Sequence, residues 1–313
     1  MTGGAGFIGS HLVRVLVEKG WSVVVLDDFS SGRMENLGGL VGSDGLRVVR
    51  GDVRDRKVVD EVLEGVDGVV HLAAFVDPAE SVRKPLFTHD VNVNGTLNVL
   101  DGCVQKGVGR FVLASSAGVY GDGNPLPLRE EYELRPVSPY AASKVSCEYY
   151  CKTFCDCYGL SNVILRFFNV YGPGQGANAY AGVITRFVRS GLRGEALTVY
   201  GDGNQTRDFI NVEDVVDAVV KALAFESSGS EVFNVCSGKP VKIDALAHSV
   251  CSVLGKDLEV VHVEPRAGDV LHSYGDPARI EKALGFKARV GLEDGLRQFV
   301  EFTRVFLACS LLL

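Results

Sequence analysis

The chain has 313 residues, which is enough for one large domain or for two lobes that share a cleft. Its net charge of -7 and pI near 5.5 argue against a nucleic-acid partner held by phosphate contacts. No N-terminal basic region leads into an apolar run, and no apolar stretch reaches the roughly 20 residues that a membrane-spanning helix needs. We therefore expect a cytoplasmic protein without a nucleic-acid or membrane partner.

Apolar runs alternate with helical patterns along the first half of the chain, which predicts a parallel sheet covered on both faces. Helices are expected over 9–20, 58–65, 89–107 and 139–159, and strands over 22–28, 46–55, 68–74 and 110–116. Residues 162–172 are expected to form a further strand that runs into a loop. After about residue 170 the β signals become short and mix with helices. We therefore predict an α/β protein with a doubly wound, Rossmann-like domain over 1–168 and a smaller, mainly substrate-binding α/β lobe over 169–313, from which a segment near 205–225 returns to the first domain.

A glycine-rich turn, TGGAGFIG, precedes the first predicted helix and places glycines at Gly3, Gly6 and Gly9. Backbone N–H groups of such a turn and of the following helix bind a dinucleotide pyrophosphate. Asp27 ends the next strand, where a carboxylate accepts hydrogen bonds from ribose hydroxyls and repels a 2′-phosphate. The pattern favours NAD over NADP. The competing interpretation is that Asp27 or Asp28 is a solvated turn residue.

Only Met1 and Thr2 stand before this turn, whereas a turn of this kind normally follows a buried strand. Loss of that central strand would leave backbone groups of both neighbouring strands unpaired, which costs on the order of several kcal/mol. We therefore expect that Met1 is not the natural start and that a short strand is absent. The apolar tail after Arg304 raises the same question at the other end.

The stretch SPYAASK places Tyr140 and Lys144 four residues apart, on one face of a helix. A phenol with a pKa of about 10 is a poor base at neutral pH. A nearby ammonium and a positive nicotinamide ring favour the phenolate and lower that pKa. Ser116, in ASSAGVYG, can hydrogen-bond the reacting oxygen, with Ser115 as the second choice. Tyr–Lys pairs also occur by chance, so the preceding nucleotide-binding pattern is what favours catalysis here.

Eight cysteines are present, and Cys147, Cys151 and Cys155 recur at helical spacing. Neither C-x-x-C pairs nor neighbouring histidines accompany them, so we expect a packed helix face and no metal site. Structural disulfides are not expected in a reducing cytosol.

Nearly the whole chain resembles an extended short-chain dehydrogenase/reductase, and most closely the UDP-glucose (UDP-galactose) 4-epimerases. The matching stretches are TGGAGFIGSH, LDDFSSG, HLAA, VNVNGT, SSAGVYG, PYAASK, LRFFNVYGP, GDGNQTRDFINVEDV and PRAGD. The resemblance implies tightly held NAD, a UDP-sugar substrate and a homodimer built on the Tyr140 helix. The NAD contacts that it implies are Gly3, Gly6, Phe7, Ile8, Gly9, Asp27, Asp52 (to the adenine), Val53, Leu72, Ala73, Ala74, Asn92, Ser115, Tyr140, Lys144 and Phe167.

In the second lobe the resemblance implies that Asn169 touches the sugar-nucleotide and that Val199 and Tyr200 line a uracil pocket. It also implies that Arg207 and Arg266 clamp the diphosphate, which suits the guanidinium fork. The implied substrate set is completed by Ser116, Tyr140 and Asp269.

The implied reaction oxidises C4 of the sugar to a 4-keto intermediate, lets it rotate, and reduces its other face. Related dehydratases and decarboxylases need an acid just after the catalytic serine, where this chain has Ala117 and Gly118. The same motifs are compatible with 4-epimerisation of UDP-N-acetylhexosamines or UDP-glucuronate, and with a non-catalytic NAD-binding sensor. The resemblance implies that the side chain at position 273 helps decide whether an N-acetyl group fits, and Ser273, beside Tyr274, suggests room for one. Val76 removes one polar contact found in relatives.

Overall fold

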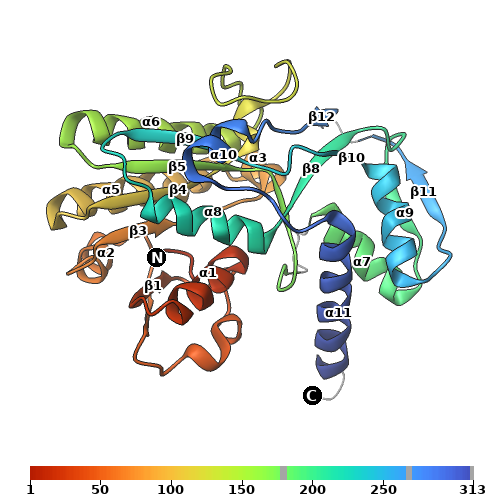
Figure 1. Ribbon diagram of the computed structural model, residues 1–313, viewed down its shortest axis with the longest axis horizontal. Coiled ribbons are helices and arrows are strands. Elements are labelled where there is room, and N and C mark those ends of the chain that lie inside the picture. Colours follow the sequence, from red (N-terminus) through yellow and green to blue (C-terminus); the bar gives the residue numbers. More distant parts are fainter. Residues whose placement is uncertain (177–181, 266–269, 311–313) are drawn as a thin grey trace.

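The structure is a computed structural model that describes residues 1–176, 182–265 and 270–310. It has a larger lobe around a parallel sheet, on the left in Figure 1, and a smaller lobe on the right. Within the described ranges, no helix combines the length and the apolar content that crossing a membrane requires.

The larger lobe contains parallel strands in the order β2-β1 and β3-β4-β5-β9, and Thr2 bridges β1 to β3. This topology confirms the predicted Rossmann-like α/β fold. The strands are β1 (Val23–Asp27), β2 (Leu46–Arg50), β3 (Gly68–His71), β4 (Arg110–Ser116), β5 (Asn162–Phe167) and β9 (Ser230–Val235).

Helices cover both faces of this sheet and bury its apolar runs. Leu12 and Val215 join one buried cluster on one face, and Val59 and Leu100 join another on the other face. The helices of the first face are α1 (Phe7–Glu18), α8 (Val212–Ala224) and α10 (Ala278–Leu284). Those of the second are α2 (Arg56–Val62), α5 (Gly95–Lys106) and α6 (Pro139–Tyr158).

Short helical segments line the loops of the larger lobe. They are η1 (Met34–Leu40), α3 (Pro78–Arg83), α4 (Pro85–His89), the π-helical turn η2 (Asp90–Asn94) and the 3-10 turn η3 (Ala117–Tyr120). The predicted helix over 89–107 therefore corresponds to η2 followed by α5.

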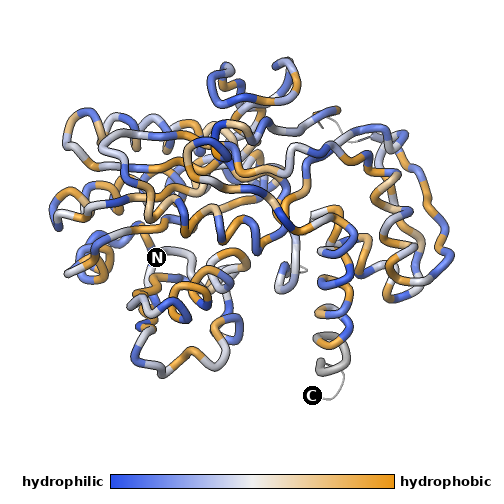
Figure 2. The backbone as a smooth tube through the Cα atoms, in the orientation of Figure 1, coloured by the Kyte–Doolittle hydropathy of each residue, from blue (hydrophilic) through white to orange (hydrophobic). Residues whose placement is uncertain are grey.

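The smaller lobe packs helices against short strands around its own core, in which Phe187, Leu246 and Leu296 are buried. Figure 2 shows hydrophobic and hydrophilic segments alternating along its helices, as one-sided burial requires. Its helices are α7 (Val183–Arg193), α9 (Ile243–Leu254) and α11 (Leu292–Ser310). Its strands are β6 (Asn169–Tyr171), β7 (Leu197–Tyr200), β8 (Thr206–Asn211), β10 (Pro240–Lys242), β11 (Val260–Val263) and β12 (His272–Ser273).

Residues 162–172, predicted as a strand running into a loop, contain two strands. β5 ends at Phe167, and β6 leaves the first sheet to pair in parallel with β8. Phe168 marks the break, because its side chain is buried in a separate apolar cluster while its N–H donates to the carbonyl of Val235. Residues 162–171 thus cross from one lobe to the other.

Met1 and Thr2 lie between β1 and β3. Thr2 forms parallel bridges to Leu26 and His71, and the Met1 amine donates to the carbonyl oxygen of Val24 at 2.6 Å. The glycine-rich turn consequently leaves the middle of the sheet at the carboxyl ends of β1 and β3, where open α/β sheets bind their ligands.

Candidate active site

The glycine-rich turn packs tightly against the loop after β3. Gly3 has a φ of +68°, and a Cβ there would lie 2.8 Å from the backbone nitrogen of Ala73; a Cβ at Gly9 would overlap the carbonyl of Gly3. A Cβ at Gly6 would meet only that carbonyl, at 3.3 Å, so this position faces open space. No side chain caps α1, which leaves its first N–H groups for an anion. The turn therefore fits a dinucleotide pyrophosphate such as that of NAD.

A buried chain of hydrogen bonds fixes the start of this turn. The Thr2 hydroxyl lies 2.8 Å from His71 Nδ1, His71 Nε2 lies 3.0 Å from the Thr96 hydroxyl, and Ala73 N–H donates to Thr2 Oγ1. Thr96 donates onward to the carbonyl of Asn92, so its proton is used and it accepts from His71. This count assigns a neutral imidazole with the proton on Nε2. Burial lowers the pKa of His71 to about 3.

Asp27, at the end of β1, is buried and holds two loops together. Its carboxylate accepts the N–H groups of Ala5, in the glycine-rich turn, and of Phe29, both at 2.9 Å. Burial raises the pKa of Asp27, and these two bonds partly offset that effect. Each oxygen keeps lone pairs for further donors, such as ribose hydroxyls. The neighbouring Asp28 is exposed and accepts from the backbone and hydroxyl of Ser30.

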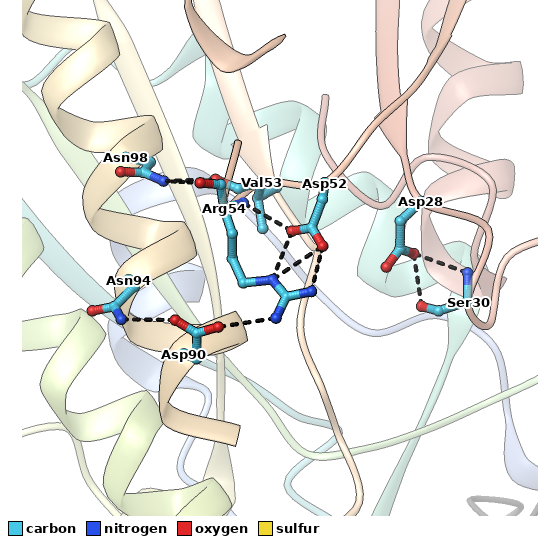
Figure 3. A network of polar contacts seen from close by, with 8 residues as sticks. All are labelled: Asp28, Ser30, Asp52, Val53, Arg54, Asp90, Asn94 and Asn98. Atoms are coloured by element: carbon cyan, nitrogen blue, oxygen red, sulfur yellow. Dashed lines mark hydrogen bonds and ion pairs between the residues drawn. The ribbon is translucent and has the colours of Figure 1, made fainter. Parts of the chain in front are cut away.

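Asp52 belongs to an ion-pair network beyond the end of β2 (Figure 3). Arg54 Nε donates to both oxygens of Asp52 at 3.0 Å, and Arg54 Nη1 donates to Asp90 at 2.9 Å. These hydrogen bonds lower the pKa of Asp52. Asn98 donates to the carbonyl of Val53, which ties the same loop to α5. Arg54 thus sets the orientation of the carboxylate that the resemblance assigns to the adenine.

Tyr140 and Lys144 lie on α6, which begins after Ser138 with proline in its first turn and a side-chain cap. The Tyr140 hydroxyl is hydrogen-bonded to Ser116, at the end of β4. Lys144 Nζ donates to the carbonyl oxygen of Ala114 at 2.8 Å. The structure therefore brings the three predicted catalytic side chains to one point.

The electrostatics of this group differ in one respect from what the sequence predicts. Burial raises the pKa of Tyr140, and the hydrogen bond with Ser116 offsets only part of that effect. Burial likewise lowers the pKa of Lys144. In the protein alone the pKa of Tyr140 is thus raised, opposite to the predicted lowering, because desolvation disfavours the phenolate. Two positive charges could favour the phenolate: the Lys144 ammonium and, with NAD bound, the nicotinamide ring.

Asn92, in the π-helical turn η2, supports the site from behind. Its amide exchanges two hydrogen bonds with the backbone of Phe75, at 2.7 and 3.0 Å, and donates to Ser143 Oγ at 2.8 Å. Ser143 in turn donates to the carbonyl of Tyr140. The Asn92 side chain is fully buried, so it links the loop after β3 to α6 rather than presenting polar atoms to a ligand.

The other residues predicted to bind the cofactor divide into two groups. One group is partly exposed around the glycine-rich turn and the loop after β3: Phe7, Ile8, Leu72, Ala73 and Ala74. The other group is buried: Val53, Ser115 and Phe167. The Ser115 hydroxyl is turned toward α6, where it donates to Glu148.

In the smaller lobe a cavity of about 650 Å³ opens beside β7 and β11. Tyr200 lines it, and Gln205 donates to the Tyr200 carbonyl at 2.6 Å. Val199 is fully buried in the lobe's core, so its side chain offers no surface to a ligand. The remaining lining residues are Gly201, Asp202, His262, Val263, Glu264, Pro265, Val270 and Leu271.

Asn169 and Arg207 lie on paired strands between the two lobes. Asn169, on β6, donates to the carbonyl of Asp208 at 3.0 Å, and Arg207, on β8, donates to the carbonyl of Leu271 at 3.3 Å. Ser273 on β12 is in register with Arg207. The other two predicted substrate residues, Arg266 and Asp269, lie outside the described residues.

Two features of the site were not predicted from the sequence. Ser81 accepts the backbone N–H of Tyr140 at 3.0 Å, and no local pattern links α3 to α6. Glu148 pairs with Arg166 behind β4. Its spacing of four from Lys144 was a signal that places it on the same helix face as Tyr140 and Lys144.

Comparison with known proteins accounts for this arrangement. The family model of the NAD dependent epimerase/dehydratase family matches residues 1–236. The chain belongs to this family. Within it, the chain falls in the UDP-glucose 4-epimerase branch of the extended short-chain dehydrogenases/reductases, and it is an NAD-using isomerase of the UDP-glucose 4-epimerase type.

Several relatives and solved structures are similar to this family member over almost its whole length. A UDP-glucose 4-epimerase from Mycolicibacterium smegmatis is 38% identical over 97% of both chains. A UDP-N-acetyl-alpha-D-glucosaminuronate decarboxylase from Bacillus cytotoxicus is 32% identical over 97% of both chains. The Thermotoga maritima UDP-glucose 4-epimerase with UDP-glucose has a TM-score of 0.93, 37% identity and 98% coverage of both chains. The Methanobrevibacter ruminantium UDP-N-acetylglucosamine 4-epimerase has a TM-score of 0.93, 37% identity and 97% coverage of both chains.

Proposed function

We propose that the protein epimerises C4 of a UDP-hexose, interconverting UDP-glucose and UDP-galactose with tightly held NAD. The observation that carries this proposal is the convergence of Tyr140, Ser116 and Lys144 at the carboxyl end of β4, next to the glycine-rich turn. The similar proteins named above support the substrate class.

Each residue has a role that follows from its position. NAD, which the glycine-rich turn and Asp27 would hold, would supply the acceptor and donor of the C4 hydride. Tyr140 takes the proton of the 4-hydroxyl and gives it back, and Ser116 hydrogen-bonds the same oxygen. Lys144, held by the carbonyl of Ala114, contributes positive charge beside the phenol.

The smaller lobe suits the opposite end of the substrate. We assign the cavity lined by Tyr200 to the uracil and Arg207 to the diphosphate. Anchoring at that end leaves the 4-keto sugar free to rotate about its bond to the diphosphate and to present its other face. Asn169, between the lobes, is assigned to the sugar-nucleotide.

Decarboxylation and dehydration fit the site less well. Ala117 and Gly118 form η3 directly after Ser116 and carry no carboxyl group. Glu130 is buried, and its Oε1 accepts the backbone N–H of Asn234 at 2.7 Å. This carboxyl group is therefore already committed to the fold.

A second candidate activity is 4-epimerisation of UDP-N-acetylhexosamines. Ser273, a small residue, stands in register with Arg207 on the strand beside the proposed diphosphate site. We expect turnover of both sugar pairs. Turnover of UDP-galactose with none of UDP-N-acetylgalactosamine would overturn this second proposal.

We also propose a homodimer through α6. Tyr149 and Tyr158 are each 61% exposed on this helix, more than aromatic side chains usually are. Sedimentation of the purified chain at micromolar concentration tests this. Sedimentation as a monomer at that concentration would contradict the proposal of a homodimer.

The main proposal is tested by incubating the protein with UDP-galactose and measuring UDP-glucose. Tyr140→Phe should lower kcat by about 10²–10⁴-fold while the bound NAD content stays the same, because it removes only the proton-transfer group. Tyr149→Phe, an exposed tyrosine of the same helix, is the matched control and should not change kcat. Absence of turnover by an NAD-loaded parent would instead favour a nucleotide-binding sensor.

A further inference from the structure

A buried ion pair lies directly behind the proposed catalytic serine. Arg166, on β5, donates to Glu148, on α6, with Nη2 2.7 Å from Oε2 and Nε 3.0 Å from Oε1. Each side chain is only 5% exposed. The hydroxyl of Ser115 donates to the same carboxylate, and Ser115 is directly opposite Arg166 in the β4–β5 ladder. One strand end, its neighbour and the catalytic helix therefore meet at this carboxylate.

Glu148 is the third member of a regular series on α6. Tyr140, Lys144 and Glu148 follow one another at intervals of four residues, so they share one helix face. Each contacts a different residue at the end of β4. The partners, in the same order, are Ser116, the carbonyl oxygen of Ala114, and Ser115.

A contribution to folding stability does not by itself explain the buried Arg166–Glu148 ion pair. Burying two charges has a desolvation cost, and replacing a buried pair by apolar side chains of similar size is often neutral or stabilising. Here both N–H groups of Arg166 Nη1 are satisfied as well, by the Tyr120 hydroxyl at 2.9 Å and the carbonyl of Glu130 at 3.1 Å. The pair thus holds a carboxylate in one fixed orientation, and that carboxylate accepts the Ser115 hydroxyl.

We propose that Glu148, oriented by Arg166, is a positioning residue that sets the end of β4 against α6 through Ser115 and so holds Ser116 at Tyr140. This inference rests on the proposed C4 epimerase function. It gives Ser115 a function in the core, next to Ser116 at the end of β4.

Two double variants separate positioning from structure. Glu148→Gln with Arg166→Met and Glu148→Met with Arg166→Met both remove the ion pair and both leave the core uncharged at these positions. They differ in one respect, because only Gln offers Ser115 an oxygen acceptor. NAD content and the unfolding midpoint of both variants are measured first, and kinetic parameters are given per NAD-loaded protomer.

For UDP-galactose turnover, the Gln variant should retain a kcat about tenfold above that of the Met variant, since misplacing a reacting group by a fraction of an ångström slows the chemical step. The KM values should agree within roughly twofold, because the nucleotide end of the substrate lies in the other lobe. Equal kcat values in the two folded variants would overturn the inference. If the parent protein turns over UDP-galactose but the two variants have the same kcat, the positioning inference fails and the proposed epimerase function is unaffected.

A second measurement needs no substrate. The ionisation of Tyr140 is followed as the ultraviolet difference between each double variant and its Tyr140→Phe derivative. Because the hydrogen bond with Ser116 lowers the pKa of Tyr140, the Met variant should ionise at higher pH than the Gln variant. Identical titrations would contradict the inference even if the parent turned over no UDP-hexose. The other titratable groups around this stretch of α6 are the same in both variants, so they do not contribute to the difference between the two titrations. They are Lys144, Cys147, Cys151, His71 and Tyr120.

Discussion

His71 shows how a single buried side chain couples the nucleotide-binding turn to the fold. It accepts from Thr2, at the start of the glycine-rich turn, and donates to Thr96, on α5. A protonated imidazole would place a second N–H against the Thr2 hydroxyl and would carry a charge in a site that is 1% exposed. The neutral ring is therefore part of the folded state.

This residue should make the protein sensitive to acid. The pKa of His71 is about 3 in the folded chain and 6.5 when unperturbed, so between these values the unfolded chain binds the extra proton. The stabilising contribution is complete above pH 6.5 and decreases as the pH falls toward 3, by about 1.4 kcal/mol per pH unit. His71→Gln, which does not titrate, should flatten this dependence. Chemical unfolding of both proteins across this range measures it, and parallel curves would exclude the effect.

At the scale of elements, the glycine-rich turn depends on contact with the loop after β3. Gly3→Ala places a methyl group against the backbone of Ala73 in addition to straining a positive φ. Gly20→Ala is the matched control, because Gly20 has a φ of +81° with nothing within 4 Å of an added Cβ.

We expect Gly20→Ala to lower the free energy of unfolding by about 1 kcal/mol and to keep NAD bound. Gly3→Ala should cost several-fold more and lose NAD. Denaturant titration and the absorbance of released cofactor check both values. Equal effects of the two substitutions would show that the contact with Ala73 is unimportant.

The middle of the first sheet is the other place where element-level pairing matters. Thr2 bridges β1 to β3 at Leu26 and His71, near their carboxyl ends, while β1 pairs with β2 and β3 pairs with β4 along their length. Five β-branched residues fused before Met1 should extend this pairing and raise the free energy of unfolding and the retention of NAD. A five-residue Gly/Ser extension is the control. The same midpoint for both fusions would contradict this expectation.

For the whole molecule, we expect the smaller lobe to bind the nucleotide end of the substrate and the larger lobe to carry out the reaction at C4. Arg207 lies on β8, in the sheet that β8 forms with β6, β10 and β12, whereas Tyr140 and the glycine-rich turn belong to the larger lobe. Arg207→Leu should raise the KM for UDP-galactose by about 10–100-fold, the size of a lost charged hydrogen bond, with NAD content unchanged. Steady-state kinetics with cofactor quantification test this. A loss of NAD with unchanged KM would mean that the assignment of Arg207 is incorrect.

Sequence patterns predicted well wherever the relevant physics is local. The strand–helix alternation indicated the parallel sheet, and the α6 spacing placed Tyr140 and Lys144 on one face. The second strand of the 162–172 segment, β6, was not predictable, because it forms by pairing with β8, which is distant in the sequence. The sequence likewise predicts an ordinary helix at Asn92. The π-helical turn there accompanies a hydrogen bond with Phe75, a residue of the loop after β3.

The motifs behind the proposed chemistry can be read from the amino-acid sequence alone, because a glycine turn followed by a helix, an acid at a strand end, and a Tyr–Lys pair one helical turn apart are all short-range patterns. Tertiary packing was needed to settle which of these side chains turn into the core. It turned Ser115 into the core toward Glu148 and Arg166, buried Val199 away from the proposed uracil site, and used the amide of Asn92 to link the loop after β3 to α6. Those partners come from residues distant in the chain, and their contacts form when α6 packs on β4 and β5.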